Sequence, residues 1–323
     1  MKKTDFEYIL GLLKKYVGWE LSEDKYFVLD RKIYNFVREK DYSTVEDLIS
    51  DLRNGQKTLL WQVIEALTLS DTCFFRDYKV FSGFENRILP HLREANRSAK
   101  KLRIWSMGCS SGQETYSIAI SVRNRLFAVS DWDIKIIGTD ISTASISKAQ
   151  KGAYTPFEIQ MGMNARTMID NFHQDGEMWQ VNRNIMDMVE FRRYNMLDDI
   201  TFSDAFDIIF CRNVLRFFSV DAQADMIRSI YKNQVPGGFL YLGMGENIAD
   251  LDKYYDPIRG MKCLYQAKLS VSKPEVTPRS SNAGGEQTPR EAPAMPKFIR
   301  PDNLRSIGSG TLRSVDPNRY RRN

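Results

Sequence analysis

Apolar residues in the first part of the chain recur every three to four positions, which is the spacing of amphipathic helices. We expect four helices there, at about residues 6–16, 26–37, 43–49 and 59–67. Ser43 and Glu46 have the spacing of a capping box and predict where the third helix begins. The pattern therefore predicts a helical domain over residues 1–75, followed by a linker helix over 76–100.

From residue 101 onward, short apolar runs alternate with stretches of helical periodicity. The predicted strands are 102–107, 134–138, 206–211 and 239–242. The predicted helices are 114–127, one through Ile146 and Ala149, and 220–233, and a turn is expected at 236–238. Such alternation is typical of an α/β fold, a mainly parallel sheet with helices on both faces, here over residues 101–272. Two further strands, at 179–182 and 189–194, are expected in a small antiparallel subdomain at about 155–195.

The loop after the first predicted strand is rich in small residues. Gly108 and Gly112 can adopt backbone angles that a Cβ forbids, and they let a ligand approach the main chain. A glycine turn alone is equally typical of an ordinary strand-to-helix connection. The second strand, however, ends at Asp140, and an acid at that place in a doubly wound sheet can accept hydrogen bonds from both ribose hydroxyls. Together the two features predict a nucleotide-type cofactor site.

The composition narrows the class of protein. The sequence has no apolar run of about 18 residues, and its first residues lack the apolar segment of a signal peptide, so we expect a cytoplasmic protein without membrane insertion. Only 2 histidines occur, and the 4 cysteines are scattered. These counts argue against a disulfide framework, a Ser-His-Asp triad and a zinc site, so we expect no metal.

The net charge of +5 comes from the end of the chain. Residues 273–323 hold 10 of the 46 Lys and Arg and 5 of the 41 Asp and Glu, which leaves 36 of each in the rest. The same stretch holds 7 of the 11 prolines, so we expect a disordered basic tail. Because the body is formally neutral, we expect no nucleic-acid partner, although a nucleic-acid methyltransferase that uses the tail is a weaker alternative.

Several separated segments resemble motifs of the CheR family, the chemotaxis receptor glutamate methyltransferases. The resembling segments are 72–77 (T-x-F-F-R in the family), 108–116 (the family's glycine loop), 138–141 (its second acidic strand end), 154–158 (the entry to its β-subdomain) and 210–215 (its fourth-strand signature). They occur in the family's order, and the similarity spans about residues 5–267. Order and spacing make the resemblance far more specific than any single motif.

The resemblance implies a fold, a reaction and a set of contacts. The implied fold is a helical domain followed by a class I S-adenosylmethionine-dependent methyltransferase domain with a Rossmann-like doubly wound sheet and an inserted β-subdomain. The implied reaction is O-methylation of glutamate side chains on the cytoplasmic helices of chemotaxis receptors, with S-adenosylhomocysteine as the other product. Family cofactor contacts fall on Ser70, Thr72, Arg76, Glu114, Asp140, Asn195, Met196, Arg212 and Asn213.

Physical reasons support several of these implied contacts. Glu114 begins a helix, where a carboxylate is favoured by the helix dipole and can meet the ammonium group of the cofactor. Asp140 suits the ribose diol. The amide of Asn195 can recognise the adenine edge, and Met196 can pack against the ring.

Arg76 is the implied catalytic residue. Methyl transfer from a sulfonium to a carboxylate is an in-line displacement, and a carboxylate is already ionised at neutral pH, so the reaction needs no general base. The enzyme still has to hold the two reactants in line, and such positioning can lower the activation free energy by roughly 7 to 11 kcal/mol in favourable cases. A guanidinium can hold a carboxylate with two charge-assisted hydrogen bonds. Arg76 can bind either the substrate glutamate or the carboxylate of the cofactor, and the sequence leaves both open.

Seven residues depart from the family pattern, among them Gln113 and Thr115, which replace a glutamate and a proline beside Glu114, and Gly245, which replaces a serine. Phe217 stands where the family has a tyrosine whose hydroxyl is thought to lie near the transferred methyl, and Arg216, Met161 and Met244 replace an isoleucine, an arginine and a histidine. Losing one neutral hydrogen bond costs roughly 0.5 to 1.5 kcal/mol, which predicts slower chemistry but not loss of cofactor binding. An alternative is therefore a catalytically weakened, CheR-like regulatory protein that binds S-adenosylmethionine or S-adenosylhomocysteine.

The loop at residues 174–177 is short. In the family, a longer loop there accompanies docking on the carboxy-terminal pentapeptide of a receptor. We therefore expect receptor recognition that does not depend on the pentapeptide, by a monomer.

Overall fold

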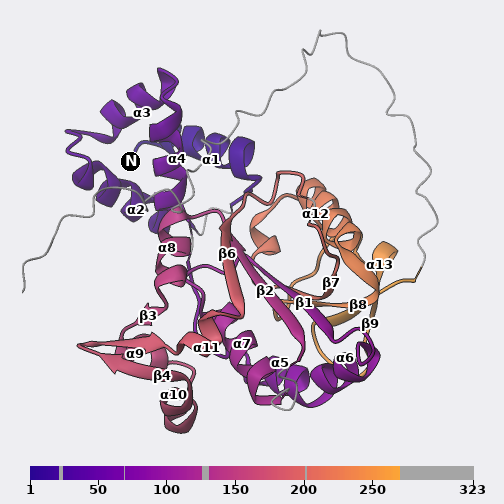
Figure 1. Ribbon diagram of the computed structural model, residues 1–323. Coiled ribbons are helices and arrows are strands. Elements are labelled where there is room, and N and C mark those ends of the chain that lie inside the picture. The colour runs from indigo at the N-terminus through magenta and orange to yellow at the C-terminus, as the bar shows by residue number, and fades with distance from the viewer. Residues whose placement is uncertain (22–24, 69, 126–130, 201, 270–323) are drawn as a thin grey trace, which may run out of the picture. The chain divides into compact units, whose positions relative to one another are not determined.

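The computed structural model describes residues 1–21, 25–68, 70–125, 131–200 and 202–269 (Figure 1). The predicted tail at 273–323 lies outside the described residues, as does the end of the predicted helix at 114–127.

The amino-terminal segment forms the four predicted helices. They are α1 (Lys3–Val17), α2 (Tyr26–Glu39), α3 (Val45–Arg53) and α4 (Lys57–Leu67). The capping box of α3 is formed by Thr44 and Asp47, so the expectation that Ser43 and Glu46 form it was wrong by one residue. Both pairs have the same spacing, and the later start keeps Val45 in the hydrophobic core.

The predicted linker helix is a helical run in three parts. These are α5 (Tyr78–Gly83), the π-helical turn η2 (Phe84–Ile88) and α6 (Leu89–Ala95). Phe81, Phe84 and Leu89 are buried along this run. The run therefore lies against the sheet as a packed layer.

The central sheet has seven strands in the order β6-β2-β1-β7-β8-β10-β9. They are β1 (Lys101–Met107), β2 (Asp133–Asp140), β6 (Val189–Arg193), β7 (Phe206–Cys211), β8 (Gln234–Leu242), β9 (Tyr255–Pro257) and β10 (Leu264–Ala267). The first five pair in parallel, and β9 and β10 are antiparallel. The chain starts in the middle and reverses direction at β7, so the predicted doubly wound sheet is confirmed.

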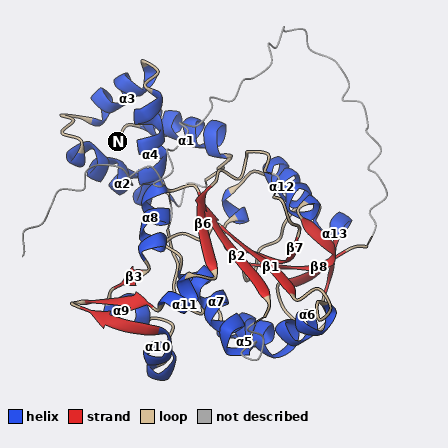
Figure 2. Cartoon of the chain, viewed as in Figure 1, coloured by secondary structure: helices blue, strands red, loops and turns tan. Residues whose placement is uncertain are grey.

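Helices cover both faces of this sheet (Figure 2). The main ones are α7 (Gln113–Arg125), α8 (Thr143–Lys151), α12 (Val220–Lys232) and the short α13 (Leu251–Tyr254). One hydrophobic core joins the face carrying α12 to the amino-terminal helices, whereas a second core lies under α5, α6 and α7. Trp105 of β1 lies in the first core and Ile104 in the second, because successive strand residues point to opposite faces.

The inserted subdomain is smaller than predicted. Its sheet has the order β3-β5-β4, from β3 (Ala153–Tyr154), β4 (Phe172–Asp175) and β5 (Met178–Val181), and it carries α9 (Pro156–Gln160) and α10 (Ala165–Asn171) before α11 (Arg183–Met186). The strand predicted at 189–194 was wrongly assigned to it, because β6 pairs in parallel with β2 in the central sheet. Gly138 makes room for this pairing, since a Cβ there would lie 2.7 Å from the Phe191 ring. The expected turn at 236–238 falls within β8 as a bulge: the pairing with β7 shifts from Phe206↔Gln234 to Ile208↔Phe239, and Gly237 has φ +76°.

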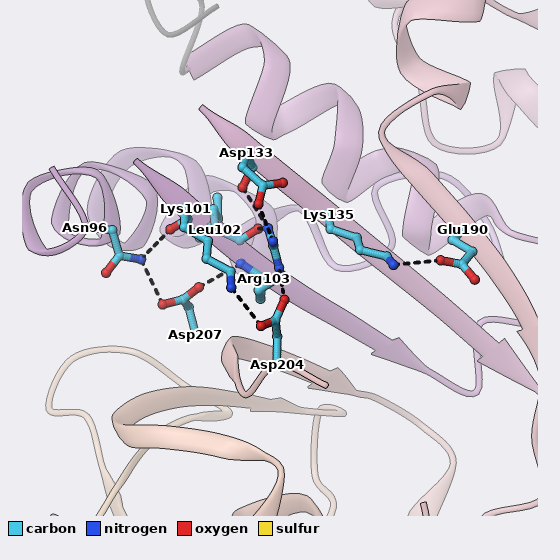
Figure 3. Close-up of polar contacts among 9 residues, drawn as sticks. All are labelled: Asn96, Lys101, Leu102, Arg103, Asp133, Lys135, Glu190, Asp204 and Asp207. Carbon is cyan, nitrogen blue, oxygen red and sulfur yellow. Dashed lines mark hydrogen bonds and ion pairs between the residues drawn. The ribbon is translucent and has the colours of Figure 1, made fainter. Parts of the chain in front are cut away.

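A network of charges ties the amino ends of the strands together (Figure 3). The buried guanidinium of Arg103 on β1 donates to Asp204 Oδ2 at 2.9 Å and pairs with Asp133 on β2. Lys101 Nζ lies 2.7 Å from Asp204 Oδ1, and the Arg103 backbone N–H donates to Asp207 Oδ2 at 2.7 Å. This network does not involve the carboxyl ends of the strands, at the opposite edge of the sheet, so a binding site can form there.

This network predicts a dependence of stability on pH. The bond from Arg103 lowers the pKa of Asp133, and bonds from Lys101 and Arg103 lower that of Asp204, whereas burial raises the pKa of Asp207. A lowered carboxyl pKa adds stability above the ordinary value of about 4, and this is lost as the pH falls through the lowered pKa. Arg103→Met should therefore lower the free energy of unfolding at pH 7, by an amount that shrinks below about pH 4.

Urea unfolding between pH 7 and pH 3 measures this effect. Arg97→Met is the matched control, because the Arg97 side chain is 80% exposed and lies 3.7 Å from the exposed carboxylate of Glu94. A deficit for Arg103→Met that stays constant over this pH range would contradict the role of the network.

Candidate functional site

A cleft lies at the carboxyl ends of β1, β2, β6 and β7. It encloses about 870 Å³ of space, open solvent included. All nine residues predicted from the sequence line it, namely Ser70, Thr72, Arg76, Glu114, Asp140, Asn195, Met196, Arg212 and Asn213. Asp140 and Arg76 therefore open onto the same cavity. The residues come from the helical domain as well as from the loops that follow the strands.

Asp140 closes the glycine loop. It ends β2, and its carboxylate accepts hydrogen bonds from the backbone N–H groups of Ser110 at 2.8 Å and Ser142 at 2.9 Å. Burial raises the pKa of this carboxyl group. Each carboxylate oxygen has a second lone pair, so the group can still accept two hydroxyl groups.

The two glycines of the loop have different tasks. Gly108 lines the cleft with φ +73°, and a Cβ there would lie 3.3 Å from Met196 Cε. Gly112 has φ +94°, but a Cβ there would meet Ala149 Cβ at 2.8 Å. Only Gly108 therefore keeps the cleft open, whereas Gly112 allows α7 and α8 to pack closely.

A fully buried guanidinium joins three parts of the site. Arg212 follows β7, and its Nη1 donates to Glu114 Oε2 at 2.8 Å while Nη2 pairs with Asp77. Nη2 also donates to the backbone oxygen of Arg76 at 3.0 Å. Glu114, in the first turn of α7, accepts a further bond from Ser106 Oγ at 3.0 Å. Arg212 thus fixes the loop that carries Arg76.

Arg76 itself stands on a constrained loop. Its neighbours Phe75 and Asp77 have φ of 49° and 62°, angles that are unusual for residues with side chains. Arg76 Nη1 donates to the backbone oxygen of Asp71 at 2.6 Å, and Nη2 lies 3.2 Å from Asp71 Oδ2. A guanidinium has five N–H donors, so others can face the cleft. A strained loop with a half-buried arginine is typical of a functional site.

Comparisons with known proteins agree with this geometry. The family model "CheR methyltransferase, SAM binding domain" matches residues 70–263. Chemotaxis protein methyltransferase 1 of Pseudomonas aeruginosa is 30% identical over 271 residues, covering 82% of this chain and 98% of the relative. Chemotaxis protein methyltransferase Cher2 of Pseudomonas putida is 31% identical over 271 residues, which also cover 82% of this chain and 98% of the relative. The chain belongs to the CheR family.

S-adenosylmethionine is the cofactor of this CheR-family chain, which is a methyltransferase with the class I fold. The cleft has the charges that the cofactor needs. Asp140 offers acceptors for a ribose diol, and Glu114 offers a carboxylate for an ammonium group. Among the described residues, no cluster suited to a metal ion and no helix able to span a membrane occurs.

The side-chain amide of Asn195 has fewer groups available for adenine than the CheR resemblance suggests, because it already forms hydrogen bonds within the protein. Its Nδ2 donates to the backbone oxygen of Tyr16 in α1 at 2.9 Å, and its Oδ1 accepts from the N–H of Leu197 at 3.2 Å. The amide therefore ties the helical domain to the end of β6. An adenine contact would use the second N–H or the remaining lone pair.

The sequence did not single out the contribution of α1 to the cleft. Val17 and Trp19 line the cavity, and the segment behind them pairs with the chain near Phe217. The backbone N–H of Glu20 donates to the oxygen of Phe217 at 2.8 Å, and Trp19 forms a β-bridge with Phe218. Trp19 belongs to no periodic run, so no local pattern could have revealed it.

Of the seven departures from the CheR pattern, only Phe217 lines the cleft. Its ring centroid lies 6.0 Å from that of Trp19. Met161 and Met244 are 57% and 47% exposed. The guanidinium of Arg216 lies over the Phe217 ring at 5.0 Å. An effect on the chemistry is therefore expected mainly from Phe217.

Glu246 holds the loop after β7. Its Oε2 accepts from the N–H groups of Asn213 at 3.1 Å and Gly243 at 2.6 Å, and its Oε1 accepts from the N–H of Arg216 at 3.3 Å. Asn213 has φ 62°, a conformation that these bonds help to hold.

Glu246→Gln should weaken this loop, because an amide cannot accept all three bonds. We expect a loss of about 1.5 to 3 kcal/mol in unfolding free energy, and weaker S-adenosylhomocysteine binding, since Asn213 lines the cleft. Urea unfolding and calorimetry measure the two effects. Glu39→Gln, at a side chain that is 73% exposed, is the control. If Glu246→Gln matched this control in both measurements, the loop would not depend on the carboxylate.

Proposed function

We propose that this chain methylates glutamate side chains on the cytoplasmic helices of chemotaxis receptors and so forms glutamyl methyl esters. Family membership and relatives named chemotaxis protein methyltransferases support this proposal. The observation that carries it is the cleft, in which an arginine held on a constrained loop shares one cavity with the proposed ribose-binding acid.

The nine predicted residues are proposed to hold the cofactor. Asp140 binds the ribose diol, Glu114 the ammonium group, and Met196 packs against the adenine ring. When bound, S-adenosylmethionine supplies a methyl group on a positively charged sulfur. Glu114 is already paired with Arg212, so its position is set before the cofactor arrives.

The lining of the cleft suits a substrate that is already ionised. Among the described residues that line it, none is a histidine, and a glutamate at neutral pH needs no base to become a nucleophile. Arg76 is proposed to orient a carboxylate with its guanidinium fork. Asp71 holds both terminal nitrogens of Arg76, Nη1 through its backbone oxygen and Nη2 through its carboxylate, which reduces the entropy lost when the substrate binds.

Phe217 favours one second candidate, a cofactor-binding regulatory protein with weak catalysis. The residue lines the cleft without the hydroxyl of the family's tyrosine. Tight binding of S-adenosylhomocysteine without methyl transfer to any receptor would favour this candidate over the enzyme.

Methyl transfer from labelled S-adenosylmethionine into receptor-rich membranes of the source organism tests the proposal, with release of the label by base as the mark of an ester. Arg76→Ala should lower the rate roughly 10²- to 10³-fold, because a preorganised charge is lost. Arg97→Ala, at a side chain that is 80% exposed, is the control. An Arg76→Ala protein with full activity would exclude the assigned role.

The same variant separates the two partners of Arg76. If Arg76 binds the substrate glutamate, Arg76→Ala leaves the Kd for S-adenosylhomocysteine unchanged. If it binds the cofactor carboxylate, that Kd rises. Calorimetry distinguishes these outcomes without any receptor.

The β4–β5 hairpin predicts that the receptor pentapeptide is not needed. Asp175 pairs with Met178, so the tip consists of only Gly176 and Glu177. A receptor that lacks its last five residues should be methylated at the same rate as the full receptor. A clearly slower rate for the truncated receptor, measured with the same labelled cofactor, would show that this chain does use the pentapeptide.

A further inference from the structure

The loop between β2 and α8 is held by a residue of the helical domain. Asp140 and Ile141 of this loop line the cleft, and Thr143 begins α8. Glu65 of α4 reaches this loop: its Oε1 accepts from Thr143 Oγ1 at 2.8 Å, and its Oε2 accepts from the Thr143 N–H at 3.3 Å. Both carboxylate oxygens of Glu65 therefore bind one residue next to the cofactor wall.

Arg193 completes the contact from the other side. It ends β6 and lies opposite Asp140 in the parallel pairing of β6 with β2. Its Nη2 lies 2.9 Å from Glu65 Oε1, and its Nε donates to the backbone oxygen of Ile141 at 3.0 Å. The guanidinium also lies over the Trp61 ring of α4, at 5.5 Å. The loop is thus bonded at both Ile141 and Thr143.

The surroundings make this contact stronger than an ordinary surface pair. The side chains of Glu65 and Arg193 are only 21% and 19% exposed, so water screens their charges less than at the surface. The carboxylate of Asp140 accepts hydrogen bonds from the N–H of Ser110 in the glycine loop and from the N–H of Ser142 in its own loop. These bonds hold Asp140 against the glycine loop, whereas Glu65 and Arg193 hold the part of the loop that follows it, at Thr143 and Ile141.

We propose that Glu65 is a positioning residue for the cofactor, through which the helical domain holds the Asp140 loop in its binding conformation. The inference rests on the proposed role of Asp140 in binding the ribose. Glu65 itself does not line the cleft, so it acts through Thr143 and Arg193. Cofactor affinity then depends on a contact outside the methyltransferase domain.

Calorimetry of S-adenosylhomocysteine binding to the full chain tests this inference. Glu65→Gln keeps the shape of the side chain but removes its charge, and it should raise Kd about tenfold. Asp140→Asn should raise Kd at least as much. The double variant should bind little more weakly than Asp140→Asn alone, because both substitutions act on the same contact. Glu39→Gln, at an exposed carboxylate of α2, should leave Kd unchanged.

A milder variant covers the case in which Glu65→Gln folds poorly. Thr143→Val removes only the hydroxyl bond to Glu65 Oε1, and it should raise Kd in the same direction by a smaller factor. Thermal unfolding without ligand separates the two roles. A merely structural role would lower the melting temperature and leave the Kd of the folded fraction at the wild-type value.

The outcomes distinguish this inference from the function on which it rests. If Asp140→Asn leaves Kd unchanged, the proposed ribose contact fails. If Asp140→Asn raises Kd while Glu65→Gln and Thr143→Val both match Glu39→Gln, the positioning role is overturned and the ribose contact stands.

Discussion

The buried guanidinium of Arg212 is the interaction on which the arrangement of the cleft depends. It is fully shielded from solvent, and it pairs with carboxylates from two separate elements, Glu114 and Asp77. A charge buried in this way is strongly unfavourable if either partner is lost, because the desolvated ion is left uncompensated. The strand end, the start of α7 and the Arg76 loop must therefore come together in one arrangement. The cleft is therefore preorganised, because any other arrangement of these elements would leave the buried charge of Arg212 without a partner.

The sequence predicted helices and strands best where the burial of a segment is compatible with only one type of secondary structure. Strand β7 was predicted with its observed limits, because a central parallel strand is apolar on both faces and its six residues are all buried. The sequence also predicted strand β6, but it did not predict that β6 pairs with β2 in the central sheet. Alternation of apolar and polar residues describes a strand equally well in either sheet, and the choice depends on Gly138, which is distant in sequence and leaves space for the Phe191 ring.

The sequence also predicted only part of the candidate site, and again the long-range contacts were missed. All nine residues named from the motifs line one cleft, but most of them came from resemblance to a family rather than from local chemistry. The residues that were missed belong to the helical domain. Trp19 follows the end of α1 outside any pattern, and Glu65 lies on the polar side of α4, where a charged residue is ordinary. Only the folded chain brings Trp19 to the cleft and Glu65 to the loop that follows Asp140, because these contacts span large sequence separations.

One hydrophobic core runs from the amino-terminal helices into the face of the sheet that carries α12. The helical domain is therefore not a detachable module. Deleting it would expose side chains that pack against it, such as Phe217 and Phe218 beside Trp19, and exchanging it for a homologous domain would require matched changes in the surface it covers. The tip of the β4–β5 hairpin differs, since a Cβ on Gly176 would meet no atom within 4 Å. Recombination can vary that tip except at Gly176, whose φ of +58° favours glycine, while the two domains must diverge together.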